Sequence, residues 1–177
     1  MLKTFSDRAE FFSYCCSKAS EGSCLEFGVY RGQSLKWMAE IFSGRPVSGF
    51  DSFDGLPEPF KNHKKGHFRA DIPDFSEFTN VHIYQGDFED TIPLYKSWVK
   101  NKKIAFIHVD CDLYSSTKTV LTMLKANIKP GTIIVFDEYQ EHEEYIKNEQ
   151  KAFLEMKFNY EIFAQTKHRV GLRIIGA

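Results

Sequence analysis

The sequence predicts an α/β protein with a Rossmann-like fold, in which helices cover both faces of a mostly parallel β-sheet. Two observations predict this fold class. Segments with strand-like and helix-like patterns alternate along the chain, which is typical of parallel strands joined by crossover helices. Near the C-terminal end, apolar and polar residues alternate on either side of a turn, which indicates an antiparallel hairpin at the end of the sheet.

The first half of the chain contains two predicted helices and three predicted strands. Apolar residues recur at helical spacing over residues 7–20 and again from Leu35 to Phe42, so each stretch is expected to form an amphipathic helix. Short apolar stretches predict strands at residues 24–29, 47–50 and 81–84.

The second half begins with the most apolar stretch, from Ile104 to Val109, which is expected to be a central strand buried on both faces. A helix is expected after this strand, and Pro130 and Gly131 mark the turn at which the helix ends. The other elements expected here are a helix that carries Thr117 to Ile128, a strand over 132–136, a helix over 142–157, and hairpin strands at 160–164 and 170–174.

Length predicts one domain over residues 1–177, and four cysteines without a paired pattern are typical of a cytoplasmic protein. This length suffices for a hydrophobic core without disulfide bonds, and 23 Lys and Arg residues against 24 Asp and Glu residues give a net charge of −1. A charge near zero argues against nucleic acid as a partner. No apolar run approaches the ~18 residues of a membrane span, and the first residues lack the apolar stretch of a signal peptide.

Ligands of such folds bind beyond the carboxyl ends of the strands, so the residues after each predicted strand are the candidate site. Gly28 and Gly32 follow the first strand, where glycine permits a tight turn close to a ligand. Their spacing departs from the dinucleotide pattern G-x-G-x-x-G, so an ordinary strand-to-helix turn remains an alternative. Asp51 lies 23 positions after Gly28, close to the ~20-residue offset of a carboxylate that accepts ribose hydroxyls.

The third strand is followed by Gly86, Asp87 and Phe88. Gly86 allows the chain to leave the strand in a tight turn. Asp87 is either the N-cap of the next helix or a contact of an adenine ring. Phe88 either stacks on that adenine or packs in the core.

Acidic residues follow the fourth and fifth strands. Asp110 and Asp112 end one strand, and Asp137 and Glu138 end the next. Neighbouring parallel strands lie about 4.8 Å apart, so the four carboxylates are expected to converge on one rim of the sheet and to repel one another. A divalent cation would relieve that repulsion, and an all-oxygen ligand set favours Mg²⁺ or a similar hard ion. Caps exposed to water are the alternative.

Residues 52–80 form a long segment between predicted strands and are expected to be a lid or mobile loop. Its basic side chains are Lys61, His63, Lys64, Lys65, His67 and Arg69. A lid that closes over a ligand and an ordinary solvated loop are equally compatible with this composition.

In combination, the residues after the strands resemble the macrocin O-methyltransferase family. The resemblance rests on five segments, which are Glu26 to Gly32, Phe50 to Pro57, Gly86 to Pro93, His108 to Tyr114 and Val135 to Tyr139. It implies a class I methyltransferase fold with seven strands, the last of them antiparallel. It also implies an S-adenosylmethionine-dependent enzyme that methylates hydroxyl groups of sugars or glycosides, with a homo-oligomer as one option for its assembly.

The resemblance also implies roles for particular residues. The cofactor would be contacted from the first three segments, by Glu26, Gly28, Tyr30, Gly32, Ser34, Asp51, Ser52, Gly86, Asp87 and Phe88. Asp110, Asp137 and Glu138 would hold Mg²⁺ or a similar cation, although the family usually has Asp where this chain has Glu138. Asp112 is the implied base, and Asp110 and His142 remain alternatives for it.

Two other functions compete with this one. A nicotinamide-dependent oxidoreductase would use the same architecture, but the broken glycine pattern and the missing Tyr-x-x-x-Lys pair count against it. A non-catalytic protein that keeps only the cofactor pocket is disfavoured by the intact set of carboxylates.

Overall fold

The computed structural model of the chain describes residues 1–99, 102–140, 142–143 and 146–176. The strands are β1 Lys3–Thr4, β2 Ser23–Phe27, β3 Val47–Asp51, β4 Val81–Gln85, β5 Ile104–Val109, β6 Ile133–Phe136, β7 Asn159–Gln165 and β8 Val170–Gly176. The helices are α1 Arg8–Cys16, α2 Gln33–Ile41, α3 Phe88–Val99, α4 Tyr114–Leu124, the π-helical turn η1 Ile146–Gln150 and α6 Lys151–Leu154.

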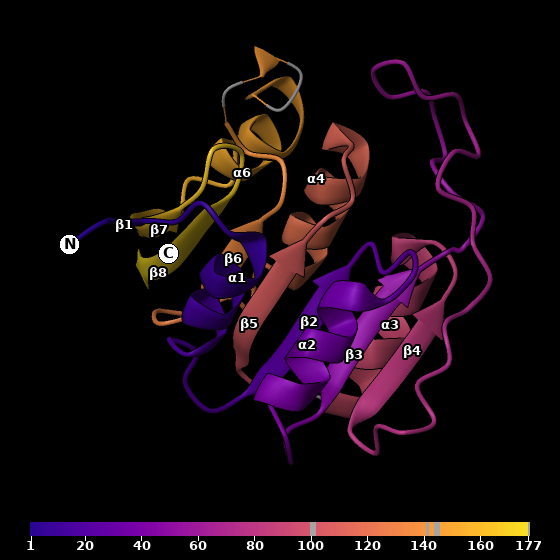
Figure 1. Cartoon of the computed structure of the whole chain (residues 1–177), viewed down its shortest axis with the longest axis horizontal. Helices are drawn as coiled ribbons and strands as arrows, with labels where there is room; N and C mark the ends of the chain where they lie inside the picture. The colour runs from indigo at the N-terminus through magenta and orange to yellow at the C-terminus, as the bar shows by residue number, and fades with distance from the viewer. Residues whose placement is uncertain (100–101, 141, 144–145, 177) are drawn as a thin grey trace.

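The strands form one sheet in the order β1-β7-β8-β6-β5-β2-β3-β4 (Figure 1). All pairings are parallel except those of β8, which runs antiparallel to both β6 and β7. The chain passes from β2 outward to β4 and then returns to the other side of β2 with β5. The order therefore reverses between β2 and β5, which is where ligands bind in open α/β sheets.

Helices cover both faces of the sheet, as the alternation of elements predicts (Figure 1). One face packs against α1 and α2, whose buried side chains include Phe12 and Met38. The other face packs against α3, α4 and α6, with Ile92, Leu121 and Phe153 in its core. The strands between these layers are almost fully buried, which explains the continuous apolar runs in the sequence.

The structure differs from the expected elements at three places. The sheet has eight strands rather than seven, because the two exposed residues of β1 pair with β7. The helix expected over 7–20 ends at Cys16, and the following residues form tighter turns, with Lys18 N–H bound to the Cys15 carbonyl. The helix expected over 142–157 is divided into η1 and α6, and its positions 144 and 145 lie outside the described residues.

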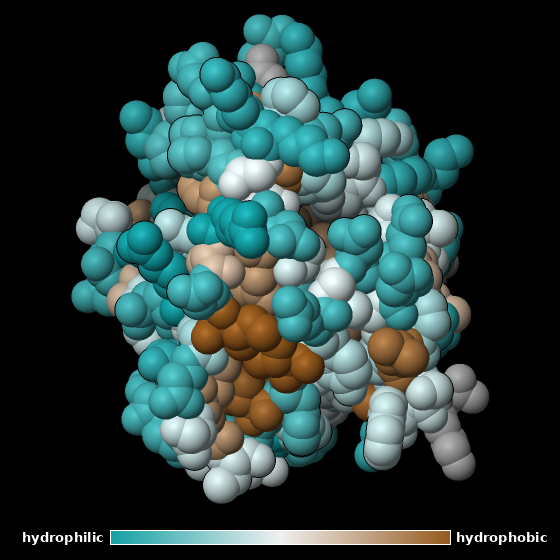
Figure 2. Space-filling view, turned by 90° about the vertical axis from the view of Figure 1, so that its right-hand side faces the viewer, coloured by the Kyte–Doolittle hydropathy of each residue, from teal (hydrophilic) through white to brown (hydrophobic). Residues whose placement is uncertain are grey.

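Figure 2 shows the side of the molecule that carries β4 and the 52–80 segment. Hydrophilic residues cover most of this side and surround an apolar area near its middle and a smaller one beside it. Among the helices of the described residues, none combines the length and the apolar character that a membrane crossing requires.

Candidate functional site

A cavity of about 560 Å³ opens at the carboxyl ends of the strands on either side of the switch point. Its walls come from the loops after β2, β3, β4, β5 and β6 and from the start of α4. All the site residues expected from the sequence line it except Glu26 and the alternative base His142. The expected residues that line the cavity are Gly28, Tyr30, Gly32, Ser34, Asp51, Ser52, Gly86, Asp87, Phe88, Asp110, Asp112, Asp137 and Glu138.

Asp51 organises the loop after β2 through its carboxylate. Oδ2 accepts hydrogen bonds from the backbone N–H groups of Val29 and Tyr30, both at 2.8 Å, and Oδ1 accepts one from Phe53 at 2.8 Å. Tyr30 and Phe53 have positive φ angles of 50° and 61°, so these bonds hold a backbone that is strained for residues with a Cβ. Asp51 thus fixes the shape of the loop that faces the cavity.

The two loop glycines are required by close neighbours within the protein. Gly28 has φ +91°, and a Cβ there would lie 1.8 Å from the carbonyl oxygen of Asp110. Gly32 has φ +77°, and its Cβ would lie 2.6 Å from the ring of Phe75 in the 52–80 segment. The loop after β2 therefore touches both the acidic end of β5 and the predicted lid.

Glu26 lies beneath the cavity, fully buried, in a pair with His108 on the next strand. The two residues are opposite each other in the register of β2 and β5, and Glu26 Oε1 lies 2.7 Å from His108 Nδ1. Burial alone would lower the pKa of His108, but the carboxylates of Asp137 and Glu26 outweigh it and raise this pKa to about 9. The buried His108 ring is therefore protonated, and its positive charge is paired with the carboxylate of Glu26.

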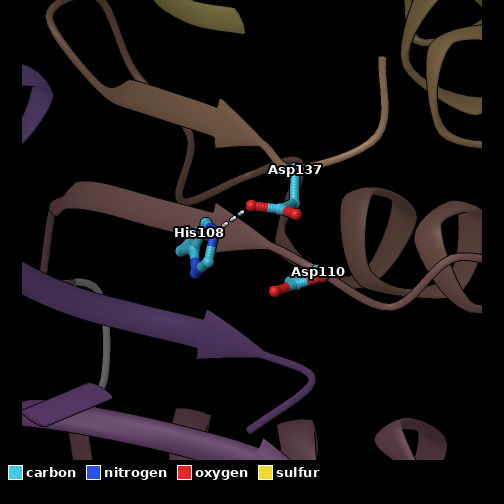
Figure 3. Close-up of side chains that lie close together, drawn as sticks. All are labelled: His108, Asp110 and Asp137. Atoms are coloured by element: carbon cyan, nitrogen blue, oxygen red, sulfur yellow. Dashed lines mark ion pairs between the residues drawn. The ribbon is translucent and has the colours of Figure 1, made fainter. Parts of the chain in front are cut away.

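His108, Asp110 and Asp137 form a compact group at the ends of β5 and β6 (Figure 3). One potential ligand atom from each of the three lies within 4.8 Å of the others. His108 Nε2 is buried without a hydrogen-bond partner, at 3.8 Å from Asp137 Oδ1. Because the raised pKa keeps a proton on this ring, the carboxylates of Asp110 and Asp137 are the members of the group that could hold a cation.

Two arginines neutralise part of the negative charge of Asp110 and Asp137. Arg8, from the start of α1, places Nη2 3.2 Å from Asp110 Oδ2 and 3.1 Å from Asp137 Oδ1. Arg169 binds Asp137 with two hydrogen bonds of 2.6 and 2.9 Å. Burial would raise the pKa of Asp137, but the nearby His108 ring, the hydrogen bonds from Arg169 and the charge of Arg8 lower it well below its usual value. Burial and the Asp137 carboxylate raise the pKa of Asp110 to about 7.

Asp112 and Glu138 form a second acidic pair further along the rim. The strand geometry ends at Val109, and Asp112 has φ +62° in a tight turn. Burial and the neighbouring carboxylate of Glu138 raise the pKa of Asp112 to about 8. Glu138 also binds Lys61 of the 52–80 segment, with Nζ 3.1 Å from Oε1.

The expected cation ligands are therefore divided between two groups. Asp110 and Asp137 lie together with His108, whereas Glu138 lies with Asp112 and Lys61. Six residues contribute carboxylates here, and we call them the acidic cluster: Glu26, Asp110, Asp112, Asp137, Glu138 and Glu149. Within the described chain its basic partners are Arg8, Lys61, His108 and Arg169. The carboxylates outnumber these basic groups by two, and the raised pKa values of Asp110 and Asp112 reflect that imbalance. A divalent cation with oxygen ligands would relieve the same repulsion.

The other candidates occupy simpler surroundings. Phe88 lines the cavity and also packs edge-on against Phe27, with ring centroids 5.3 Å apart. The backbone carbonyl of Asp87 accepts a hydrogen bond from Thr91 N–H at 3.0 Å, which leads the chain into α3. His142, the alternative base, stacks on His168 with ring centroids 5.1 Å apart and does not line the cavity.

Sequence reasoning does not identify Arg8, Arg169, His108 or Glu149 as members of the site. Arg8 and Arg169 come from parts of the chain far from the motifs, and no local pattern marks them. His108 does carry a signal that could have found it, because a histidine within an otherwise apolar buried strand requires a partner.

Comparisons with known proteins agree with this geometry. The family described as Macrocin-O-methyltransferase (TylF) matches residues 10–162. A tetracenomycin 4'-O-methyltransferase of Streptomyces olivaceus, named for its 2,3-dimethoxy-rhamnosyl substrate, is 28% identical over 140 residues, which are 67% of this chain and 53% of that protein. Demethyldecarbamoylnovobiocin O-methyltransferase of Streptomyces niveus is 29% identical over 142 residues, with the same coverage. The chain thus spans about half the length of these relatives.

Solved structures share the fold. The calicheamicin methyltransferase CalS11 matches with a TM-score of 0.74 and 22% identity, over 91% of this chain and 75% of that chain. The O-methyltransferase NovP matches with a TM-score of 0.67 and 20% identity, over 95% and 79%. These likenesses confirm the class I methyltransferase fold, and the family match over most of the sequence confirms the resemblance. The chain belongs to the macrocin O-methyltransferase family.

Proposed function

We propose that the chain is an enzyme that transfers the methyl group of S-adenosylmethionine to a hydroxyl group of a sugar or glycoside, assisted by a divalent cation. The observation that carries this proposal is one cavity in which the loop held by Asp51 faces the ends of β5 and β6 with their carboxylates. Family membership supports methyl transfer, and the S. olivaceus relative is named for a rhamnosyl substrate.

On the cofactor side, the chain provides a preformed cradle. S-adenosylmethionine, when bound, supplies a methyl group that is already activated by its sulfonium. The loop from Gly28 to Ser34 and the residues after β3 and β4 would hold it in place. The backbone N–H groups use about three of the four acceptor positions of Asp51, two on Oδ2 and one on Oδ1, so Oδ1 can still accept from a ribose hydroxyl. Phe88 offers an apolar ring face at the end expected for the adenine.

On the acceptor side, the chain must make a weakly nucleophilic hydroxyl reactive. A hard divalent cation held by Asp110, Asp137 and Glu138 would supply a Lewis acid that lowers the pKa of that hydroxyl. Asp112 would take the proton, a contribution of roughly 10²–10⁴-fold. Burial and the Glu138 carboxylate raise its pKa when no cation is bound, and a cation held by Glu138 would lower it again and leave the carboxylate ionised to accept the proton.

The remaining expectations follow from this function. The partner would be a small hydroxylated molecule of the sugar or glycoside class, in the cytoplasm. A homo-oligomer stays a prediction.

The test is transfer of radiolabelled methyl groups from S-adenosylmethionine to a panel of glycosides and nucleotide-linked sugars. We expect transfer with Mg²⁺ and its loss in EDTA and in Asp110→Asn. Glu161→Gln, which removes an exposed carboxylate that pairs with Arg173 on the hairpin, is the matched control and should stay active. Full activity in EDTA would exclude the cation, and cofactor binding without transfer to any acceptor would favour a non-catalytic binding protein.

A further inference from the structure

Glu149 is a fully buried carboxylate that lies between the two acidic strand ends. It belongs to the π-helical turn η1, and its side chain points back toward β5 and β6. Oε1 accepts a hydrogen bond from Cys111 N–H at 3.3 Å, and Oε2 accepts one from Glu138 N–H at 3.2 Å. One carboxylate therefore connects the loop that carries Asp110 and Asp112 with the loop that carries Asp137 and Glu138.

The two N–H groups that Glu149 binds are the first ones beyond the sheet. The last ladder bond of β5 runs from Asp110 N–H to the Phe27 carbonyl at 2.9 Å. The last ladder bond of β6 runs from Asp137 N–H to the Val109 carbonyl at 3.0 Å. Where each strand leaves the ladder, the next amide is bound by one oxygen of Glu149, so this side chain continues the pairing of the two strands past their ends.

The loop after β5 turns sharply at this point. Leu113 N–H binds the Cys111 carbonyl at 2.6 Å, and Asp112 between them has a positive φ. Asn148, the residue before Glu149, accepts a hydrogen bond from Tyr114 N–H at 3.0 Å, at the start of α4. Adjacent residues of η1 thus hold three backbone N–H groups around the acidic turn. Single π-helical turns of this kind are frequent at functional sites.

The position is electrostatically unfavourable for a carboxylate. Glu149 has Asp110, Asp112 and Glu138 as neighbours, and burial without solvent adds to the cost. A glutamine or an apolar side chain would avoid this repulsion, but it would not offer two oxygens to two N–H donors. Glu149 thus fixes the positions of the two strand ends at the cost of electrostatic repulsion from the neighbouring carboxylates.

We propose that Glu149 is a positioning residue that sets the separation of the two acidic strand ends, and so the geometry of the proposed cation and base. Its consequence for catalysis rests on the proposed function, whereas its consequence for the backbone does not. Partners that orient cation ligands typically change cation affinity or activity by 10–100-fold when they are replaced.

The test uses Glu149→Gln, with Glu155→Gln as the matched control. Glu155 is an exposed glutamate shortly after η1 that binds Lys118 and the Tyr114 hydroxyl. Hydrogen exchange measured by mass spectrometry should become about tenfold faster or more at residues 110–114, 137–140 or both in Glu149→Gln only, because Gln keeps one acceptor oxygen and places an NH₂ donor against the other N–H group. Unchanged exchange in both segments would overturn the proposal.

Kinetics provide the second measurement. In Glu149→Gln we expect kcat to fall about 10–100-fold while the KM for S-adenosylmethionine and the affinity for S-adenosylhomocysteine change less than about threefold, because the cofactor side lies on other strands. An equal loss of cofactor affinity would indicate general disruption and contradict a positioning role. If the wild type transfers no methyl group, the proposed function fails, and the exchange data alone decide this inference.

A second variant covers the case in which Glu149→Gln does not fold. Asn148→Ala removes the side-chain acceptor of Tyr114 N–H and leaves the carboxylate of Glu149 in place. Exchange should then rise around residues 113–115 and stay at the wild-type rate at 137–140. A rise in both segments, or in neither, would contradict the inference that Asn148 and Glu149 hold different backbone N–H groups independently.

Discussion

At the scale of single residues, the missing Cβ of Gly28 links the two sides of the site. The Asp110 carbonyl occupies the space that a side chain at Gly28 would require. The cofactor loop and the end of β5 therefore pack backbone against backbone at this point. This contact explains a glycine here better than close approach to a ligand does.

We expect Gly28→Ala to destabilise the protein by about 2 kcal/mol or more, because strain at positive φ is combined with an overlap against backbone. Gly44→Ala is the control, since Gly44 has φ +80° but no atom within 4 Å of the point where a Cβ would lie. Thermal unfolding of both variants measures the difference. Equal losses would show that backbone strain alone matters at Gly28.

Glu26 and Asp51 show where sequence reasoning identifies a residue but not its surroundings. Both are expected from the sequence to contact the cofactor. Asp51 lines the cavity and also holds the loop through three N–H groups, whereas Glu26 is fully buried against His108. The position at a strand end is visible in the sequence, but the side of the sheet and the partner depend on the register of β2 and β5.

At the scale of elements, the 52–80 segment is bound to the rest of the site at several points. Lys61 binds Glu138, and Ser115 donates to Glu58 at 2.8 Å. Phe68 packs edge-on against Tyr30, with ring centroids 5.6 Å apart. These contacts join the segment to both the cofactor loop and the acidic rim, so its release would open both sides of the cavity.

We expect Phe68→Ala to speed hydrogen exchange and proteolysis within residues 52–80 and to weaken S-adenosylhomocysteine binding a few-fold. The melting temperature should change little, because Phe68 is 38% exposed and outside the main cores. Ile72→Ala, 48% exposed in the same segment, is the control. Equal exchange in both variants would show that the Tyr30 contact does not hold the segment down.

The elements that the sequence predicts well are those with long apolar patterns. The buried strands and the apolar faces of α2 and α4 appear where the periodicity places them. β1 escapes prediction because two exposed residues carry no pattern. The π-helical turn is expected to be plain helix, since nothing in local composition shows that Glu149 will bind residues 38 and 11 positions away. Long-range partners of this kind arise only from the tertiary fold.

At the scale of the whole molecule, a net charge of −1 conceals an uneven distribution. The six carboxylates of the acidic cluster meet at one rim, and their basic partners come from distant segments, with Arg8 102 positions from Asp110 and Lys61 77 positions from Glu138. The convergence of Asp110, Asp112, Asp137 and Glu138 was predictable because parallel strands end together. Their pairing with arginine and lysine was not, since it depends on α1 and the 52–80 segment folding over the rim.

This distribution predicts how the stability of the metal-free protein depends on pH. The pKa values of Asp110 and Asp112 are raised to about 7 and about 8 in the folded state, so the folded protein binds more protons than the unfolded chain above the ordinary carboxyl pKa of 3.8. Where the folded protein binds more protons, the free energy of unfolding falls as pH rises, and this continues until the folded-state pKa values are passed. His108, raised from 6.5 to about 9, adds a change of the same sign. The depressed pKa of Asp137 acts only at acidic pH.

In EDTA, we therefore expect the melting temperature to fall by on the order of 5 °C as pH rises from about 5 to about 8. Asp112→Asn should flatten this decline, because it removes one of the groups that take up protons on folding. Added Mn²⁺ or Mg²⁺ should flatten it as well, since a cation replaces the bound protons and stabilises the folded state. Thermal unfolding across pH, with and without the cation, measures all three. A melting temperature that rises over this range in EDTA would contradict the raised carboxyl pKa values, and a cation without effect at about pH 8 would contradict its binding at the rim.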